Sequence, residues 1–183
     1  MIDRFIAASL IILLLPFFAL IALLIVLEDG FPFYFIQKRV SGEHDFKFVK
    51  FRSMYKNAPN LSTNDFTDSY KYITRVGKII RKTSIDETLN LINIVKGDMH
   101  FIGPRPIIPE EKELQELRTS LRVFAKPGIT GLAQINGRDN ISIREKVLYD
   151  KYFQIHKSAK LRTYIILKTL YIVAFRKDVV HWG

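Results

Sequence analysis

The chain of 183 residues contains no cysteine, which excludes disulfide bonds, catalysis by a thiolate and cysteine-ligated zinc, and is compatible with a reducing compartment. It also lacks internal repeats and an Asp-x-Asp metal motif. The four histidines are scattered, and no two have the spacing of metal ligands on one helix: His44, His100, His156 and His181. Chemistry in this chain is therefore expected from carboxylates, hydroxyls and cations.

Acidic residues are scarce relative to basic ones, with 18 Asp and Glu against 28 Lys and Arg and a net charge of +10 at pH 7. Residues 1–30 contain one basic and three acidic side chains, so the basic excess belongs to the rest of the chain. Such a surplus favours anionic partners, meaning nucleic acid, lipid headgroups or a nucleotide-type substrate. The length suits one compact domain in addition to the first thirty residues.

The segment from Phe5 to Leu27 contains no charged residue and, as a helix of 23 residues, would extend about 34 Å, enough to cross a hydrocarbon core. Pro16 lies in its middle, where its ring opposes the carbonyl of Ile12, so a kink or break is expected there. Two interpretations follow, a kinked transmembrane helix and a re-entrant hairpin that returns to the same face. A cleaved signal peptide is disfavoured because the apolar run is too long and no small-residue cleavage site follows it.

The first elements after Gly30 are expected to be two strands, 33–40 and 46–53, which form a β-hairpin. A polar loop follows at 55–69, and helical spacing of apolar residues predicts a short helix over 70–82.

Three further helices are expected in the second half of the chain. One opens at Pro109 with an acidic first turn, and carries Leu114, Leu117 and Leu121 on one face. After a loop at 126–140, capping-box spacing predicts a helix from Ser142 to about residue 156. The last, at 160–177, mixes apolar and basic residues in a way that suits either the bilayer interface or an ordinary buried helix.

An acidic pair, Asp86 and Glu87, stands among basic residues in the stretch 81–106. Ser84 and Glu87 have capping-box spacing, so capping of a helix N-terminus accounts for both acids without any chemistry. The same helix start would keep Asp86 ionised and attract a phosphate, and an ionised carboxylate can act as a nucleophile. Spacing leaves both interpretations open.

A set of motifs occurs in order over nearly the whole length of the chain. They are Lys50-Phe51-Arg52-Ser53-Met54, Arg81 with Ser84-Ile85-Asp86-Glu87, Asn93-Ile94-Val95-Lys96-Gly97-Asp98-Met99, Gly103-Pro104-Arg105-Pro106, Lys126-Pro127-Gly128-Ile129-Thr130-Gly131, Ala133-Gln134-Ile135-Asn136-Gly137-Arg138, and Asp150 with Tyr152. With these motifs the chain resembles the bacterial sugar transferase family of small monotopic phosphoglycosyl transferases. Each motif alone is weak evidence, but their joint presence in order is highly specific.

The resemblance implies a two-step reaction in which a UDP-sugar donates its sugar phosphate to undecaprenyl phosphate and UMP leaves. Asp86 matches the family's nucleophile, and Glu87 matches its partner acid, which would help deprotonate or orient the lipid phosphate. Mg²⁺ would bridge Asp86 and the diphosphate. The substrate-binding residues implied are Lys50, Arg52, Arg81, Arg105, Lys126, Gln134 and Arg138.

The fold implied is α+β and mainly helical, with a re-entrant membrane helix broken at Pro16, a small β-hairpin and several amphipathic interfacial helices. Residues 1–30 would be embedded in the bilayer, and residues 31–183 would form the catalytic domain on the cytoplasmic face of the bacterial inner membrane. Glycosyltransferases acting later in glycan assembly are candidate partners, and nucleic acid is not. The chain departs from the family pattern at three positions, with Leu15 in place of Ser, Lys126 in place of Arg and Leu132 in place of Trp.

Two other functions compete with this prediction. A glycosyltransferase that moves the sugar without its phosphate would release UDP rather than UMP. A membrane-anchored binding module would use its basic residues to hold anionic lipid or nucleic acid, although the aromatic residues do not form a recognisable RNA-binding sheet motif.

Overall fold

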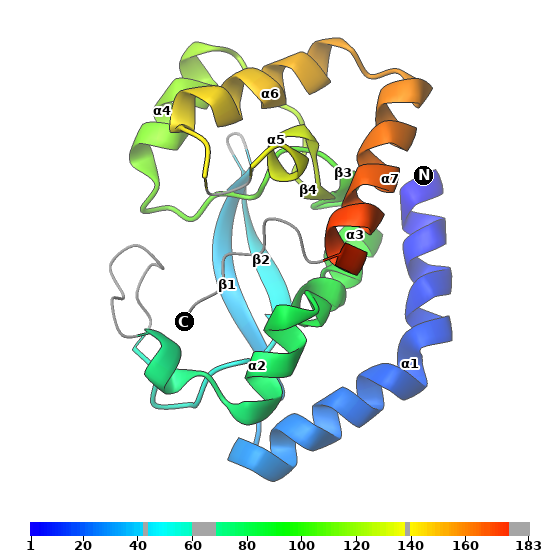
Figure 1. The fold of residues 1–183 in the computed structure, drawn as a ribbon, viewed down its shortest axis with the longest axis vertical. Coiled ribbons are helices and arrows are strands. Elements are labelled where there is room, and N and C mark those ends of the chain that lie inside the picture. The colour runs from blue at the N-terminus through cyan, green and yellow to red at the C-terminus, as the bar shows by residue number, and fades with distance from the viewer. Residues whose placement is uncertain (42–43, 60–68, 138–139, 176–183) are drawn as a thin grey trace. The chain divides into compact units, whose positions relative to one another are not determined.

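The computed structural model describes residues 1–41, 44–59, 69–137 and 140–175 (Figure 1). These residues fall into two compact units, which we describe separately. The described residues of unit 1 lie within 1–37 and 48–95, and those of unit 2 within 38–47 and 96–175. The expected division at residue 30 concerns membrane embedding and stays a prediction.

Unit 1 begins with one long helix, α1 (Ile2–Asp29), which contains Pro16. Figure 1 shows α1 changing direction near its middle, and the helix continues without interruption across the proline. The proline therefore bends the helix, and the expected break does not occur. Among the described residues, α1 is the one helix long and apolar enough to cross a membrane. The mainly helical fold with a small β-hairpin is confirmed.

The C-terminal half of α1 packs onto the rest of unit 1. The Phe18 ring meets the Phe51 ring edge-on, with 5.7 Å between their centroids, and Ile21 and Ile25 are buried. At the helix end, the carboxylate of Glu28 accepts hydrogen bonds from the backbone N–H groups of Arg75 (2.6 Å) and Val76 (3.0 Å). These two N–H groups belong to the first turn of the α-helix α2 (Arg75–Lys82) and have no acceptor within that helix. Glu28 therefore caps α2 although it is 47 residues away in the sequence.

The predicted hairpin is confirmed as β1 (Tyr34–Ser41) and β2 (His44–Phe51), which pair as a two-stranded sheet. Along this hairpin the chain passes from unit 1 to unit 2 and back. Most of the predicted polar loop at 55–69 lies outside the described residues.

The helix predicted over 70–82 is two elements, a 3₁₀ turn η1 (Ser69–Tyr72) and the helix α2 (Arg75–Lys82). Thr74 separates them because it is extended, and its hydroxyl caps α2 by accepting from the N–H of Gly77 at 2.8 Å. A second 3₁₀ helix, η2 (Ile85–Asn90), and α3 (Leu91–Lys96) complete unit 1.

Unit 2 contains a short parallel sheet that the sequence did not predict, formed by β3 (His100–Ile102) and β4 (Gly128–Thr130). Its helices are α4 (Lys112–Ser120), α5 (Leu132–Ile135), α6 (Ile143–Ile155) and α7 (Ala159–Phe175). Helix α6 contacts both α4 and α5, and α7 contacts α5 and β4 (Figure 1).

Two apolar clusters hold these elements together. One joins Ile102, Leu132, Ile135, Phe153 and Ile165, and the other joins Ile107, Leu114, Val123 and Val147. Leu117 and Leu121 pack on the second cluster, as their helical spacing predicted.

The predicted helix starts in unit 2 agree with the structure at α6 but not at α4. The capping box at Ser142 and Glu145 is confirmed. Helix α4 begins at Lys112 with Glu111 as its N-cap, so the predicted start at Pro109 was too early. Helix α7 buries only Ile165 and exposes seven large apolar side chains: Tyr164, Ile166, Leu167, Leu170, Tyr171, Val173 and Phe175. This exposure is typical of a helix that lies against a lipid surface.

Candidate active site

Asp86 lies in η2. Ser84, immediately before η2, has a left-handed backbone conformation that sets the direction of η2. Ser84 has φ 56° and ψ 19°, and its N–H donates to the carbonyl of Arg81 at 3.1 Å. The chain thereby turns back, and η2 packs against α2. The Ser84 side chain makes no capping hydrogen bond, so the predicted capping box with Glu87 was wrong. A capping serine needs an extended backbone, which Ser84 does not have.

The carboxyl group of Asp86 is buried, with 9% of the residue exposed, and it is surrounded by charge. Burial raises its pKa to about 6, and the neighbouring charge of Glu87 acts in the same direction. The positive charges of Lys50 and Arg81 lower the pKa but do not offset burial. With a pKa of about 6 the group is still mostly ionised at neutral pH, as expected, although burial opposes its ionisation.

Arg81 approaches this carboxyl group from the last turn of α2. Its Nε donates to the hydroxyl oxygen of Ser53 at 2.7 Å, which fixes the orientation of the guanidinium group. Burial lowers the pKa of Arg81, and the attraction of Asp86 raises it. On β2, the Lys50 ammonium lies 5.5 Å from the centre of the Phe35 ring. Unit 1 thus brings four of the predicted site residues together: Lys50, Arg81, Asp86 and Glu87.

Arg52 has a role that the sequence did not reveal. Its Nη2 donates to the carbonyls of Asp29 (3.2 Å) and Gly30 (2.5 Å), and lies 3.3 Å from the Asp29 carboxylate. It therefore holds the C-terminal end of α1. Its Nε and Nη1 are buried and have no hydrogen-bond partner among the described residues, so its predicted substrate contact stays a prediction.

Unit 2 carries the other predicted site residues that the structure describes, Arg105, Lys126 and Gln134. Within the described part of the chain, the Arg105 side chain makes no hydrogen bond or ion pair. The Lys126 ammonium donates to the carbonyl of Gly97 at 2.8 Å, and the Gln134 amide nitrogen reaches the carbonyl of Gly103 at 3.4 Å. Arg138 lies outside the described residues.

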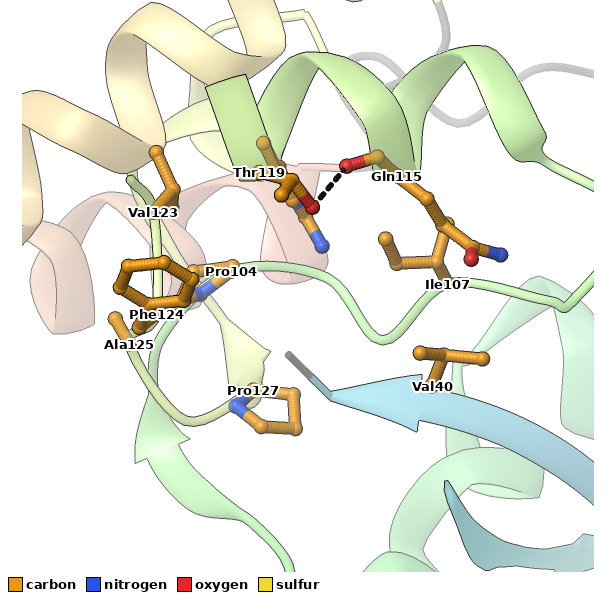
Figure 2. A pocket seen from close by; sticks show the side chains of 10 residues that line it. Val40, Pro104, Ile107, Gln115, Thr119, Val123, Phe124, Ala125 and Pro127 are labelled. Atoms are coloured by element: carbon orange, nitrogen blue, oxygen red, sulfur yellow. Dashed lines mark hydrogen bonds between the residues drawn. The ribbon is translucent and has the colours of Figure 1, made fainter. Parts of the chain in front are cut away.

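The loops that carry Arg105 and Lys126 pack closely at two glycines. A Cβ atom on Gly103 would collide with the backbone of Lys126, and one on Gly128 would collide with the backbone of Gly103. The loops also border a pocket that includes residues of β1 and α4, shown in Figure 2. The pocket is lined by Val40, Pro104, Ile107, Gln115, Arg118, Thr119, Val123, Phe124, Ala125 and Pro127.

Comparison with known proteins shows which family the chain resembles in sequence. The sequence profile of the family described as bacterial sugar transferase matches residues 1–176. The chain belongs to the bacterial sugar transferase family. This confirms the resemblance drawn from the ordered motifs and places the chain among the transferases.

Three relatives match this sugar transferase over most of its length. It is 33% identical to the UDP-galactose-lipid carrier transferase of Erwinia amylovora over 93% of the chain and 39% of the relative. It is 31% identical to the exopolysaccharide production protein ExoY of Sinorhizobium fredii over 92% of the chain and 81% of the relative. It is 36% identical to the UDP-N-acetylgalactosamine-undecaprenyl-phosphate N-acetylgalactosaminephosphotransferase of Aeromonas hydrophila, over 85% of the chain and 38% of that protein. The chain thus spans less than half of the first and third relatives.

The carboxylates of this sugar transferase fit Mg²⁺ held jointly with a substrate. In the described ranges, no group of three or more His, Cys, Asp or Glu side chains could hold a metal ion by itself. Mg²⁺ is commonly bound by one or two carboxylates together with substrate phosphates and water. Asp86 and Glu87 would supply such oxygen ligands. Glu87 raises the pKa of Asp86, and a bound cation would offset this repulsion between the two carboxylates.

Two buried asparagines follow Asp86 in the sugar transferase. The side-chain oxygen of Asn93 accepts from the N–H of Val49 at 3.2 Å, and so ties α3 to β2. Asn90 is buried, and neither atom of its amide has a partner among the described residues. The spacing of Asp86, Asn90 and Asn93 indicates a polar stripe in the sequence, but Asn90 and Asn93 were not among the predicted site residues.

Proposed function

We propose that this protein transfers a sugar phosphate from a UDP-sugar to undecaprenyl phosphate, releases UMP, and so begins the assembly of a polysaccharide on its lipid carrier. One observation carries the proposal, namely a buried aspartate between a second carboxylate and two cations in a member of the sugar transferase family. The names of the Erwinia and Aeromonas relatives, which describe transfer from UDP-sugars to a lipid carrier or undecaprenyl phosphate, support it.

In the first step, a carboxylate oxygen of Asp86 attacks the phosphorus that bears the sugar. The bond from this phosphorus to the bridging oxygen breaks, and UMP leaves with the electron pair. The product on the protein is a phosphosugar-aspartyl ester. With a pKa of about 6, Asp86 is largely ionised at neutral pH and more basic than an ordinary aspartate, which favours attack.

In the second step, a phosphate oxygen of undecaprenyl phosphate attacks the same phosphorus, and the Asp86 carboxylate is released. Glu87 accepts a proton from the lipid phosphate or orients it. The lipid-linked sugar diphosphate is then the product, and Asp86 is ready for another cycle.

Cations of the chain bind the phosphoryl oxygens. The Arg81 guanidinium is oriented by Ser53, so its alignment costs little entropy when substrate binds. Lys50 adds positive charge near Asp86. Arg105, Lys126, Gln134 and Arg138 contact the nucleotide-sugar. Mg²⁺, when bound, offsets the repulsion between the anionic carboxylates and the diphosphate.

The protein acts at the membrane. The apolar length of α1 and the exposed apolar side chains of α7 support attachment to a bilayer. We propose that α1 is re-entrant, because it bends near its middle, and that the catalytic residues face the cytoplasm. Glycosyltransferases that extend the product are the expected partners.

The direct test is UMP release by purified protein given Mg²⁺, undecaprenyl phosphate and a panel of UDP-sugars. UMP should form with at least one sugar, whereas release of UDP would indicate transfer of the sugar alone. Intact mass after addition of the donor alone should show a phosphosugar adduct that Asp86→Asn cannot form. A folded preparation that releases UMP from none of the sugars would overturn the proposal.

Topology is tested separately. Cysteines introduced at Met1 and Glu28, one at a time, should both be labelled by a membrane-impermeant reagent from the cytoplasmic side if α1 is re-entrant. Labelling from opposite sides would show that α1 spans the membrane.

A further inference from the structure

The backbone that carries Arg105 is held at four consecutive carbonyl groups, all by residues of unit 2. The carbonyl of Pro104 accepts from the N–H of Gly128 (2.9 Å), and that of Ile107 accepts from the N–H of Val40 (2.8 Å). The two carbonyls between them accept from arginine side chains. Arg118 Nη1 donates to Arg105 at 3.0 Å, and Arg39 Nη1 donates to Pro106 at 3.0 Å.

Arg118 is itself held in place by a buried acid. From α4, its Nη2 and Nε donate to one carboxylate oxygen of Asp150 on α6, at 2.6 and 3.2 Å. The side chains of Arg118 and Asp150 are 11% and 2% exposed. An arginine that uses three nitrogens on two partners has little rotational freedom, so the carbonyl of Arg105 meets a fixed donor.

The Arg105 side chain contrasts with its backbone. It is partly exposed, and within the described part of unit 2 its guanidinium has no hydrogen-bond or ion-pair partner. Pro104 and Pro106 flank Arg105, and their rings fix φ at two of the four residues whose carbonyls are held. A fixed backbone that presents an unpaired guanidinium is an arrangement prepared for an anion, because binding then orders only the side chain.

We propose that Arg118, oriented by Asp150, is a positioning residue for the transfer reaction, and acts through Arg105 by fixing the backbone that presents its guanidinium to a phosphoryl group. The proposal rests on the phosphate-binding role given to Arg105 in the proposed function. Arg118 touches no substrate in this account. Its effect on the reaction should therefore disappear when Arg105 can no longer bind phosphate.

A double-mutant cycle separates this role from a merely structural one, because residues that act through each other are not additive. The cycle combines Arg105→Gln with Arg118→Lys, whose single ammonium can keep Asp150 but cannot also hold the Arg105 carbonyl in the same geometry. A second Arg118 variant, Arg118→Met with Asp150→Leu, removes the charge pair as a unit and leaves no unpaired buried charge.

The measurement is kcat and KM for UMP release with an accepted UDP-sugar, alongside the melting temperature of each variant. In the wild-type background, we expect each Arg118 variant to lower kcat/KM by about 10- to 100-fold, mainly through a higher KM for the UDP-sugar. In the Arg105→Gln background, the same changes should lower it by less than about twofold. Arg144→Gln, an exposed position on α6, is the matched control and should change neither value.

Equal losses in both backgrounds would show that Arg118 only supports the fold, and would overturn the inference. Failure of both Arg118 variants to fold would have the same meaning. If Arg105→Gln left transfer unchanged while Asp86→Asn abolished it, the role of Arg105 and this inference would fall, but the proposed reaction would stand. If the wild-type protein released no UMP, the proposed function itself would fail.

Discussion

Two segments of this molecule share the pattern Ser-Ile-x-Glu, and they adopt different backbones. At Ser142 the chain is extended (φ −62°, ψ 156°), the hydroxyl accepts from the N–H of Glu145 at 3.2 Å, and the Glu145 carboxylate accepts from the N–H of Ser142 at 2.9 Å. At Ser84 the chain is left-handed (φ 56°, ψ 19°), and the serine makes no capping hydrogen bond. One copy opens an α-helix, and the other opens a 3₁₀ turn that carries Asp86.

The acidic residues of the two copies also differ in exposure. Glu145 lies on the surface, where its hydrogen bonds with Ser142 lower its pKa. Asp86 is buried, and removal from water raises its pKa to about 6. The exposed copy is held by its own local hydrogen bonds, whereas the buried copy packs against α2. The segment at Ser84 thus has no capping box, and it carries a carboxyl group, that of Asp86, with a raised pKa.

The largest expected contrast lies at the third position of the two copies. Asp86→Asn should lower UMP release by about 10⁴-fold or more, because the nucleophile is lost. Arg144→Asn, the corresponding change in the other copy, should leave the rate within about twofold, because Arg144 is exposed. Substantial activity of Asp86→Asn under single-turnover conditions would contradict the role of Asp86.

The free energy of unfolding of the protein should depend on pH through the buried carboxyl group of Asp86. The folded-state pKa of Asp86 is raised, so folding favours its protonated form, and this contribution is lost as pH rises from about 4 through about 6. At pH 7.5 without metal, Asp86→Asn should therefore stabilise the protein by about 1–3 kcal/mol. The gain should vanish below pH 4. Melting curves across this range in EDTA would show it, and an equal effect at all pH values would contradict it.

Removing the serine hydroxyl should affect the two copies unequally. Ser142→Ala loses a capping box and should destabilise the protein by about 1 kcal/mol. Ser84→Ala removes no cap and should cost less than about 0.5 kcal/mol. Urea unfolding in detergent measures both. Equal losses would mean that Ser84 caps η2 in solution.

Glycine at the same two positions should have the smallest effects on stability, with opposite signs. Ser84→Gly should stabilise the protein by a few tenths of a kcal/mol, about the strain of a left-handed residue minus the added backbone entropy of the unfolded chain. Ser142→Gly should destabilise it by about the same amount. A destabilised Ser84→Gly variant would argue against a left-handed backbone at this position.

Local patterns were sufficient to predict the parts of the fold that depend on nearby residues. The hairpin, the cap of α6 and the apolar face of α4 are all read from neighbouring side chains. The parallel sheet was missed because β3 and β4 have three residues each, and their pairing depends on contacts between residues 28 positions apart in sequence. Strands this short carry no alternation that could be recognised.

The site was predictable in its composition but not in its energetics. The motifs pointed to Asp86, Glu87, Arg81 and Lys50, and the structure brings these four together. The direction of the Asp86 pKa shift could not be predicted because burial is a property of the folded chain. Asp150 did leave a signal, since it falls at helical spacing between Val147 and Phe153, which are the other buried residues of α6. An acid on a buried helix face needs a cationic partner, which is Arg118.

The short helix α2 sets a length scale within unit 1. Its first N–H groups rest on Glu28 at the end of α1, and its last turn presents Arg81 beside Asp86. Eight helical residues extend about 12 Å. Asp86 is thus separated from the end of α1 by a rigid spacer of about two turns. In the proposed function, the length of α2 would therefore set how far from the end of α1 the lipid phosphate has to lie.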